Sequence, residues 1–182
     1  KDIEYYLFDE NPYIDEPYGP NWKDMQELFF KAANIPDERI HIMTSNDWQD
    51  YDNKIRNAGG IDVMVIGLGY DGHFCGNCPR CTPFDSYTYC IDFKKKQAVN
   101  PDYGDRPRQP HTLTMGPKSL MRVKHLVMIV NGKEKAEIFK RFLDEPVNQD
   151  VPATILKLHP NFTVICDQAA ASLIDPQQYS NL

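Results

Sequence analysis

The chain has 182 residues, of which 41% are hydrophobic and 12% aromatic, enough to bury one substantial core in a single domain over residues 1–182. Its 20 Lys and Arg against 26 Asp and Glu give a net charge of −6, which argues against nucleic-acid binding through the phosphate backbone. With no apolar run that could span a bilayer or serve as a signal sequence, we expect a cytoplasmic protein with a small-molecule partner and no membrane contact.

The first third of the chain predicts strands and helices in alternation. Apolar residues recur at helical spacing before Pro36, and the pair Gly59-Gly60 marks a helix end. The run IDVMVIG is short, β-branched and almost uninterrupted, which predicts a strand buried on both faces of a parallel sheet. The predicted strands cover 3–8, 39–43 and 61–67, and the predicted helices cover 21–35 and 46–58.

The rest of the chain continues the same alternation. HLVMIV at 125–130 is the second strongest signal for a buried strand, and Pro117 and Pro152 suit the first turns of helices. Strands are predicted over 88–93, 125–130 and 162–166, with a helix over about 134–143 and a short Ala-rich helix at the end, and the segment 111–115 leads into a helix start at Pro117. The predicted fold class is α/β, a mostly parallel sheet with helices on both faces.

The segment GLGYDGHFCGNCP (67–79) follows the strongest predicted strand and gathers an aspartate, a histidine and several glycines. Open parallel sheets bind ligands beyond the carboxyl ends of their strands, so Asp71 and His73 are expected at the mouth of a cleft. Gly69 and Gly72 let the backbone turn sharply and approach a ligand closely. The alternative is a polar turn in which Asp71 only makes a local Asx-type bond.

GLGYDGH resembles the G-x-G-x-DGH signature of the glucosamine-6-phosphate deaminase and 6-phosphogluconolactonase superfamily. The resemblance extends, in the family's order, to YYLFDENPY (5–13), to HTLTMGPKSLMRVKHLVMIVNGKEKAEIF (111–139) and to VPATILKLHPNFTVICDQAAAS (151–172). It implies a Rossmann-like sugar-phosphate enzyme without a cofactor. The expected reaction is isomerisation or deamination of an amino-sugar phosphate such as glucosamine-6-phosphate, and the alternative is hydrolysis of a sugar-phosphate lactone. A homo-oligomer is compatible with this interpretation.

The chain opens at Lys1 and enters its first predicted strand at once. The resemblance implies a further strand, a phosphate-binding loop and a helix ahead of that strand. We therefore expect an N-terminally truncated domain, in which part of the phosphate site is absent.

Acid/base chemistry on a sugar phosphate needs a carboxylate and a histidine beside an anchored phosphate. By resemblance, Asp9 matches the carboxylate that removes the C2 proton. His73 matches the histidine that handles the ring oxygen in deaminases or activates water in lactonases. Asp71 is placed to orient His73 and to stabilise its imidazolium form. Glu10 follows Asp9, and because neighbouring residues on a strand point to opposite sides, only one of them is expected to face substrate.

The resemblance assigns Lys135 to the substrate phosphate, where a helix N-terminus would add partial positive charge. Lys133 is the close competitor for this role. Arg106 and Arg108 lie in a loop where related enzymes present arginines, and His111 stands close to the predicted cleft. With Gly69 and Gly72, these residues complete the candidate substrate contacts.

One position departs from the deaminase pattern. Where deaminases have Asn-Glu-Pro after the DGH motif, this chain reads Asn77-Cys78-Pro79. A neutral thiol supplies no charge near pH 7 unless its pKa is lowered, so support for the imidazolium would fall to Asp71. Lactone hydrolysis, isomerisation without ammonia release and a non-catalytic sugar-phosphate sensor therefore stay open.

The cysteines raise a hypothesis of another class. Cys75, Cys78 and Cys81 form C-x-x-C-x-x-C, with His73 adjacent and Cys90 nearby, enough soft ligands for zinc or an iron–sulfur cluster. Against a metal site, the segment overlaps the turn of a family that needs no metal. Without metal, reduced thiols are expected in a cytosolic protein.

Overall fold

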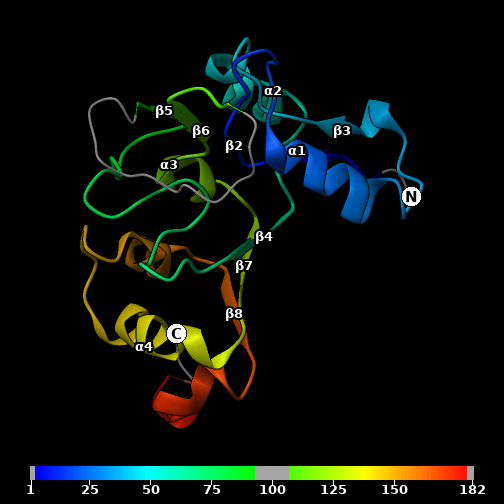
Figure 1. Cartoon of the computed structure of the whole chain (residues 1–182). Helices are drawn as coiled ribbons and strands as arrows, with labels where there is room; N and C mark the ends of the chain where they lie inside the picture. Colours follow the sequence, from blue (N-terminus) through cyan, green and yellow to red (C-terminus); the bar gives the residue numbers. More distant parts are fainter. Residues whose placement is uncertain (1–2, 93–106, 180–182) are drawn as a thin grey trace. The chain divides into compact units, whose positions relative to one another are not determined.

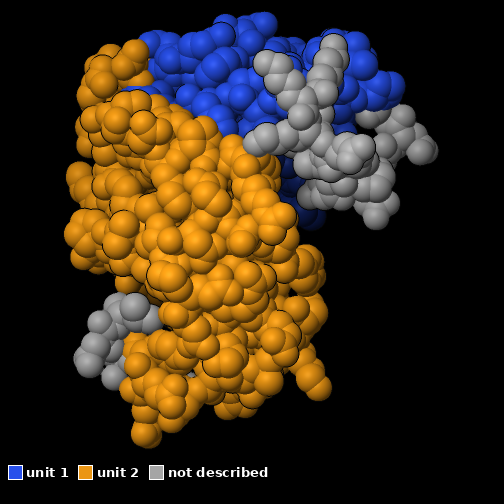
Figure 2. Space-filling model, turned by 90° about the vertical axis from the view of Figure 1, so that its left-hand side faces the viewer, with its two compact units in different colours: residues 1–52, 88–115 blue, residues 53–87, 116–182 orange. Residues whose placement is uncertain are grey.

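The computed structural model describes residues 3–92 and 107–179, which fall into two compact units. Unit 1 comprises residues 1–52 and 88–115, and unit 2 comprises residues 53–87 and 116–182 (Figure 2). The expectation of a single domain over residues 1–182 stays a prediction. Arg106, one of the candidate phosphate ligands, lies outside the described residues.

A parallel three-stranded sheet forms the centre of unit 2 (Figure 1). Its strands lie in the order β4, β7, β8, and the register sets Gly67 opposite Ile129 and Ile129 opposite Ile165. The apolar runs predicted as strands form them, because continuous β-branched segments suit parallel pairing. The bounds are β4 Val63–Gly67, β7 His125–Val130 and β8 Phe162–Cys166.

One face of this sheet carries the core of unit 2. Met64, Leu126 and Met128 are buried on it, and the ring of Phe142 in α4 (Ala136–Asp144) packs edge-on against Phe162 of β8 with centroids 6.2 Å apart. The apolar stripe of α4 therefore fixes this helix to the sheet. The shorter helices of unit 2 are α3 (Pro117–Leu120) and the 3₁₀ segments η5 (Lys133–Lys135), η6 (Pro152–Leu158), η7 (Ala170–Leu173) and η8 (Pro176–Tyr179).

The opposite face of the sheet is open in the described part of the chain. Val63, Val65, Ile129 and Ile165 alternate with the buried residues and are 44–56% exposed. The prediction that residues 61–67 are buried on both faces is therefore wrong for these residues. Successive strand residues point to opposite faces, and α4 packs against the face that bears Met64 and Phe162, whereas the alternate side chains stay exposed within the described residues.

Unit 1 contains two small sheets. In the first, β1 (Tyr5–Tyr6) pairs in parallel with β3 (Ile40–His41). In the second, β2, β6 and β5 pair antiparallel in that order, unlike the mostly parallel arrangement expected. Antiparallel neighbours need no helical crossover between them. Their bounds are β2 Asp9–Glu10, β5 Tyr89–Asp92 and β6 His111–Thr114.

The helices of unit 1 are more broken than predicted. The segment expected as one helix over 21–35 is an α-helix, α1 (Pro20–Met25), that continues as a π-helix, η1 (Gln26–Phe30). The helix expected over 46–58 begins as a 3₁₀ turn, η3 (Trp48–Asp50), before α2 (Tyr51–Asn57), and a further 3₁₀ turn, η2, covers Asp37–Arg39. Within 3–92 and 107–179, every helix is too short or too polar to cross a membrane.

We predict that Tyr51→Phe destabilises the protein by about 1–2 kcal/mol, measured by urea unfolding. Tyr51 is buried, and its hydroxyl donates to the carbonyl oxygens of Leu7 at 2.7 Å and His41 at 2.9 Å. The matched control is Tyr179→Phe, which removes a hydroxyl from the surface carboxylate of Asp144 and should cost less than about 0.5 kcal/mol. Equal losses in the two variants would contradict the prediction.

Candidate active site

The Gly-rich turn that follows β4 holds an aspartate and a histidine in direct contact. Nδ1 of His73 lies 2.6 Å from Oδ1 of Asp71, and the same oxygen accepts the backbone N–H of His73 at 3.1 Å. Both side chains are about half exposed. The imidazole ring is thereby oriented through Nδ1, which leaves Nε2 as the ring nitrogen for chemistry.

Two glycines of this turn have steric reasons to be glycine. A Cβ on Gly69 would lie 2.1 Å from Nδ1 of His73, so only a hydrogen fits beside the imidazole. Gly72 has φ +87°, and a Cβ there would lie 2.8 Å from Cγ1 of Val151. The turn is closed by two hydrogen bonds, from Gly69 N–H to the His73 carbonyl at 2.8 Å and from Gly72 N–H to the Gly69 carbonyl at 3.0 Å.

The contact between the two side chains changes the acidity of Asp71. The hydrogen bond to His73 lowers the pKa of the Asp71 carboxyl group, and partial burial opposes this effect. Asp71 is therefore ionised throughout the neutral range.

Lys135 reaches the same turn from the segment that follows β7. Its Nζ donates to the carbonyl oxygen of Leu68 at 2.6 Å and lies 3.4 Å from the centroid of the Tyr70 ring. Burial lowers the pKa of the Lys135 ammonium, whereas Glu134 and Asp71 raise it. Lys133, the competing candidate, is exposed in the same 3₁₀ segment. The structure thus brings Lys135 together with Asp71, His73, Gly69 and Gly72.

Asp9 lies in β2, which belongs to unit 1, whereas Asp71, His73 and Lys135 belong to unit 2. Its Oδ1 accepts a hydrogen bond from Nδ2 of Asn21 at 2.8 Å, and Nδ2 also lies 3.2 Å from the Asp9 carbonyl oxygen. Asp9 and Asn21 line a pocket of about 410 Å³ within unit 1, together with Tyr5, Tyr6, Leu7, Phe8, Asp24, Met25 and Phe30. The aspartate is therefore held in place at an accessible pocket.

Glu10 has a different role from Asp9. It is buried, and its carboxylate accepts the backbone N–H groups of Asn11 at 2.8 Å, Asn21 at 3.2 Å and Trp22 at 2.9 Å. The bonds from Asn21 and Trp22 satisfy N–H groups at the first turn of α1. Burial raises the pKa of the Glu10 carboxyl group, although the backbone hydrogen bonds lower it. Asn21 thus contacts both carboxylates, through its backbone N–H to Glu10 and through its side-chain amide to Asp9.

The remaining described candidates lie in unit 1. His111 opens β6 and pairs with Asp92, whereas Asp9 pairs with Thr114. Because His111 and Thr114 are three positions apart on one strand, the register points His111 and Asp9 to opposite faces. Burial lowers the pKa of His111. Arg108 forms an antiparallel β-bridge with Tyr13, a residue near the start of the chain.

The cysteines do not form the metal-binding cluster of the alternative hypothesis within the described residues. Cys78 and Cys81 are joined in a disulfide, which corrects the expectation of reduced thiols at these positions. Their Cα atoms are 5.7 Å apart across a tight turn, a separation that permits the bond. Among the described residues, no three His, Cys, Asp or Glu side chains converge as they would around a metal ion. The carboxylate that contacts His73 is that of Asp71.

Sequence reasoning missed several residues that build the site. Tyr70 lies within the motif GLGYDGH, and its place in that motif could have marked it as a residue of the site. Asn21 lies in the first turn of α1, where a polar side chain gave a weak hint. Val151 supports Gly72 from a distant loop, and a contact between residues so far apart in the chain has no local signature.

The fold and this constellation define an α/β protein with an aspartate–histidine pair and a lysine in the segments that follow two neighbouring parallel strands. Residues 1–165 match the family described as glucosamine-6-phosphate isomerases/6-phosphogluconolactonase, and the chain belongs to that family.

Two relatives named glucosamine-6-phosphate deaminase show the range of the similarity. The protein from Clostridium acetobutylicum is 34% identical over 181 residues, which cover 94% of this chain and 72% of that protein. The protein from Shouchella clausii is 35% identical over 160 residues, which cover 82% of this chain and 64% of that protein. The chain therefore spans part of the length of each relative.

Solved structures agree with this assignment. A monomeric glucosamine-6-phosphate deaminase superposes with a TM-score of 0.79 and 28% identity, covering 96% of this chain and 76% of that one. The 6-phosphogluconolactonase from Trypanosoma brucei superposes with a TM-score of 0.67 and 18% identity, covering 93% and 73% of the two chains. The second likeness concerns the fold alone.

We predict that His73→Ala raises the pKa of Asp71 toward the ordinary carboxyl value of about 3.9, measured by NMR titration of its carboxyl carbon. His125→Ala is the control, because His125 contacts Thr163 of the sheet and should leave the Asp71 midpoint unchanged. Since the folded-state pKa is lowered, ionised Asp71 contributes stability above about pH 3.9 that is lost as the pH falls through the folded-state value. An unchanged midpoint in His73→Ala would refute the assigned hydrogen bond.

Proposed function

We propose that this chain is the catalytic part of a sugar-phosphate isomerase/deaminase that acts on an amino-sugar phosphate such as glucosamine-6-phosphate. The observation that carries the proposal is the Asp71–His73 pair, held at 2.6 Å one turn beyond a parallel strand and next to Lys135, in a chain of this family. The names of the deaminase relatives supply the substrate.

His73 is the acid/base residue for opening the sugar ring. Asp71 fixes the tautomer and orientation through Nδ1, so Nε2 is the nitrogen that takes the proton of the C1 hydroxyl and passes it to the ring oxygen, as the bond from C1 to the ring oxygen breaks and the C1 carbonyl forms. The half-exposed position of His73 lets a substrate reach the ring. An imidazole suits this exchange because its ordinary pKa lies near neutrality.

Asp9 is the base for the following step. It takes the proton from C2 of the open-chain aldose while the C1 carbonyl oxygen takes up a proton from solvent, which gives an enolamine. The Asp9 carboxyl group then returns its proton to C1, and the double bond shifts to C2 and the nitrogen as a protonated imine. The resulting C2 imine takes up water and releases ammonia, which leaves the ketose phosphate. Asn21 supports this role because its side-chain amide donates to Oδ1 of Asp9 and holds the carboxylate in place.

Lys135 is the phosphate ligand. Its ammonium rests on the Leu68 carbonyl and the Tyr70 ring, both at the edge of the catalytic turn. A substrate phosphate arriving at this turn offers a stronger, charge-assisted partner than a neutral carbonyl does.

Lactone hydrolysis is the second candidate, and one observation favours it. The Asp71–His73 pair is complete within unit 2, and activation of a water molecule by His73 would need no base at C2. The cysteine at position 78, joined to Cys81, also replaces the carboxylate of the deaminase pattern. The two reactions therefore differ in whether they require Asp9.

We predict that the natural full-length protein releases ammonia from glucosamine-6-phosphate, and that Asp9→Asn and His73→Ala each lower kcat by about 10²–10⁴-fold. The assay compares ammonia release with hydrolysis of 6-phosphogluconolactone in all three proteins. Lactone hydrolysis that survives Asp9→Asn, without ammonia release in any protein, would establish the second candidate. Inactivity of the wild type on both substrates would contradict both reactions and favour a sensor.

We also predict that Lys135→Met raises KM for the phosphorylated substrate about 10- to 100-fold, because a charged hydrogen bond to the phosphate is lost. Lys133→Met is the matched control, two residues away in the same 3₁₀ segment, and should change KM by less than about twofold. Initial-rate kinetics measure both variants. A larger effect at Lys133 would transfer the phosphate role to that residue.

A further inference from the structure

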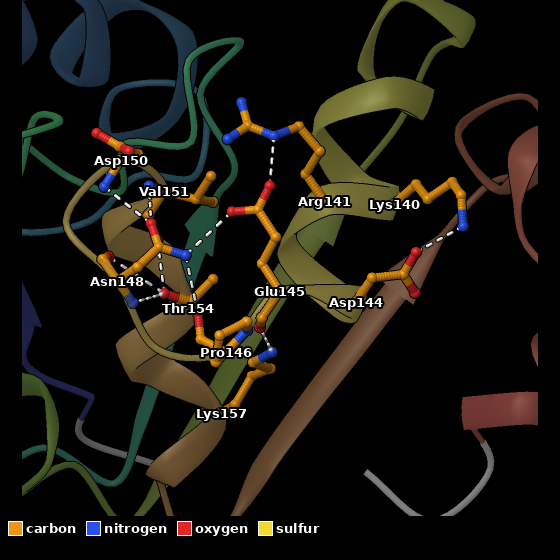
Figure 3. A network of polar contacts seen from close by, with 10 residues as sticks. All are labelled: Lys140, Arg141, Asp144, Glu145, Pro146, Asn148, Asp150, Val151, Thr154 and Lys157. Atoms are coloured by element: carbon orange, nitrogen blue, oxygen red, sulfur yellow. Dashed lines mark hydrogen bonds and ion pairs between the residues drawn. The ribbon is translucent and has the colours of Figure 1, made fainter.

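The loop between α4 and η6 is organised around one asparagine (Figure 3). Oδ1 of Asn148 accepts the backbone N–H groups of Asp150 at 2.8 Å and Val151 at 2.9 Å. Its Nδ2 donates to Oε2 of Glu145 at 3.0 Å and to the Pro146 carbonyl at 2.8 Å. Both donors of the amide nitrogen and the carbonyl oxygen are thus engaged, so Asn148 ties four points of the loop together.

The helices on either side anchor this loop. On the α4 side, Nε of Arg141 contacts Oε1 of Glu145 at 2.6 Å, and Lys157 of η6 donates to the Glu145 carbonyl. On the η6 side, the buried hydroxyl of Thr154 accepts the Asn148 N–H at 3.0 Å and donates to the Val151 carbonyl at 2.7 Å. Because Asn148 links the end of α4 to the start of η6, a displacement of this loop would also displace Val151.

The far side of the loop supports the catalytic turn. Val151 is fully buried against Gly72, where a Cβ would meet its Cγ1 at 2.8 Å, and Ala153 N–H donates to the Gly72 carbonyl at 3.0 Å. Gly72 separates Asp71 from His73 in the sequence. A displacement of Val151 would therefore move the peptide that sets the distance between the two catalytic side chains.

We infer that Asn148 is a positioning residue for the Asp71–His73 pair, acting through Val151 and Gly72. The inference rests on the proposed function only for its kinetic consequence. The geometric consequence, a change in the environment of the His73 imidazole, holds whatever the substrate is. The hydrogen bonds described for Asn148 all join it to residues 145–154, so its effect on the pair would be indirect.

The test compares Asn148→Ala and Val151→Ala with Lys140→Ala in the natural full-length protein. Lys140 pairs with Asp144 on the exposed side of α4, apart from the loop, and provides a matched control on the same helix (Figure 3). The ¹⁵N-labelled imidazole signals of His73 report its position, and kcat and KM report turnover. A Tm for each variant separates loss of fold from loss of position.

In Asn148→Ala and Val151→Ala, we expect shifted His73 imidazole signals and a kcat lowered about 10- to 100-fold, with KM changed less than about threefold. Lys140→Ala should match the wild type in all of these. If Asn148→Ala does not fold, Asn148→Asp takes its place in the comparison. The aspartate keeps the acceptor for both backbone N–H groups and loses the donor to Glu145 and Pro146. Unshifted His73 signals in the folded variants would overturn the inference. An inactive wild type with shifted signals would instead refute the proposed function and leave the positioning role standing.

Discussion

The parallel pairing of β4 with β7 is the constraint on which the candidate site depends. It sets Gly67 level with Ile129, so the segments that follow the two strands emerge side by side. The turn carrying Asp71 and His73 leaves one strand, and the 3₁₀ segment carrying Lys135 follows the other. The hydrogen bond from Lys135 to the Leu68 carbonyl joins the two segments directly. A register shift of one residue would turn each strand's buried face outward and separate these groups.

Close packing then decides how accurately the groups are held. Gly69 lies against the imidazole of His73 and Gly72 against Val151, so neither position has room for a side chain. The loop organised by Asn148 supplies the surface against which the turn rests. Steric fit at the glycines and hydrogen bonding in a remote loop therefore act on the same pair of side chains, which is the arrangement that preorganised acid/base chemistry requires.

The sequence features that differ from the deaminase pattern acquire a physical meaning in this context. Cys78 brings no carboxylate to His73, and its sulfur is joined to Cys81. The half-exposed Asp71 is the carboxylate that contacts the imidazole, with its pKa lowered by that contact. Val63, Val65 and Ile165 form the exposed apolar face of this sheet in the described residues.

The sequence alone could predict the features that depend on residues close together in the chain. Continuous apolar runs gave the three strands of unit 2 within two residues of their observed ends, and the spacing of Asp71 and His73 placed them on one turn. Only the tertiary structure decided that Val151 supports Gly72, that the sheet is covered on one face, and that the predicted helix over 21–35 ends as a π-helix. These features depend on contacts between distant segments and on the space left after packing, neither of which local periodicity or motif spacing encodes.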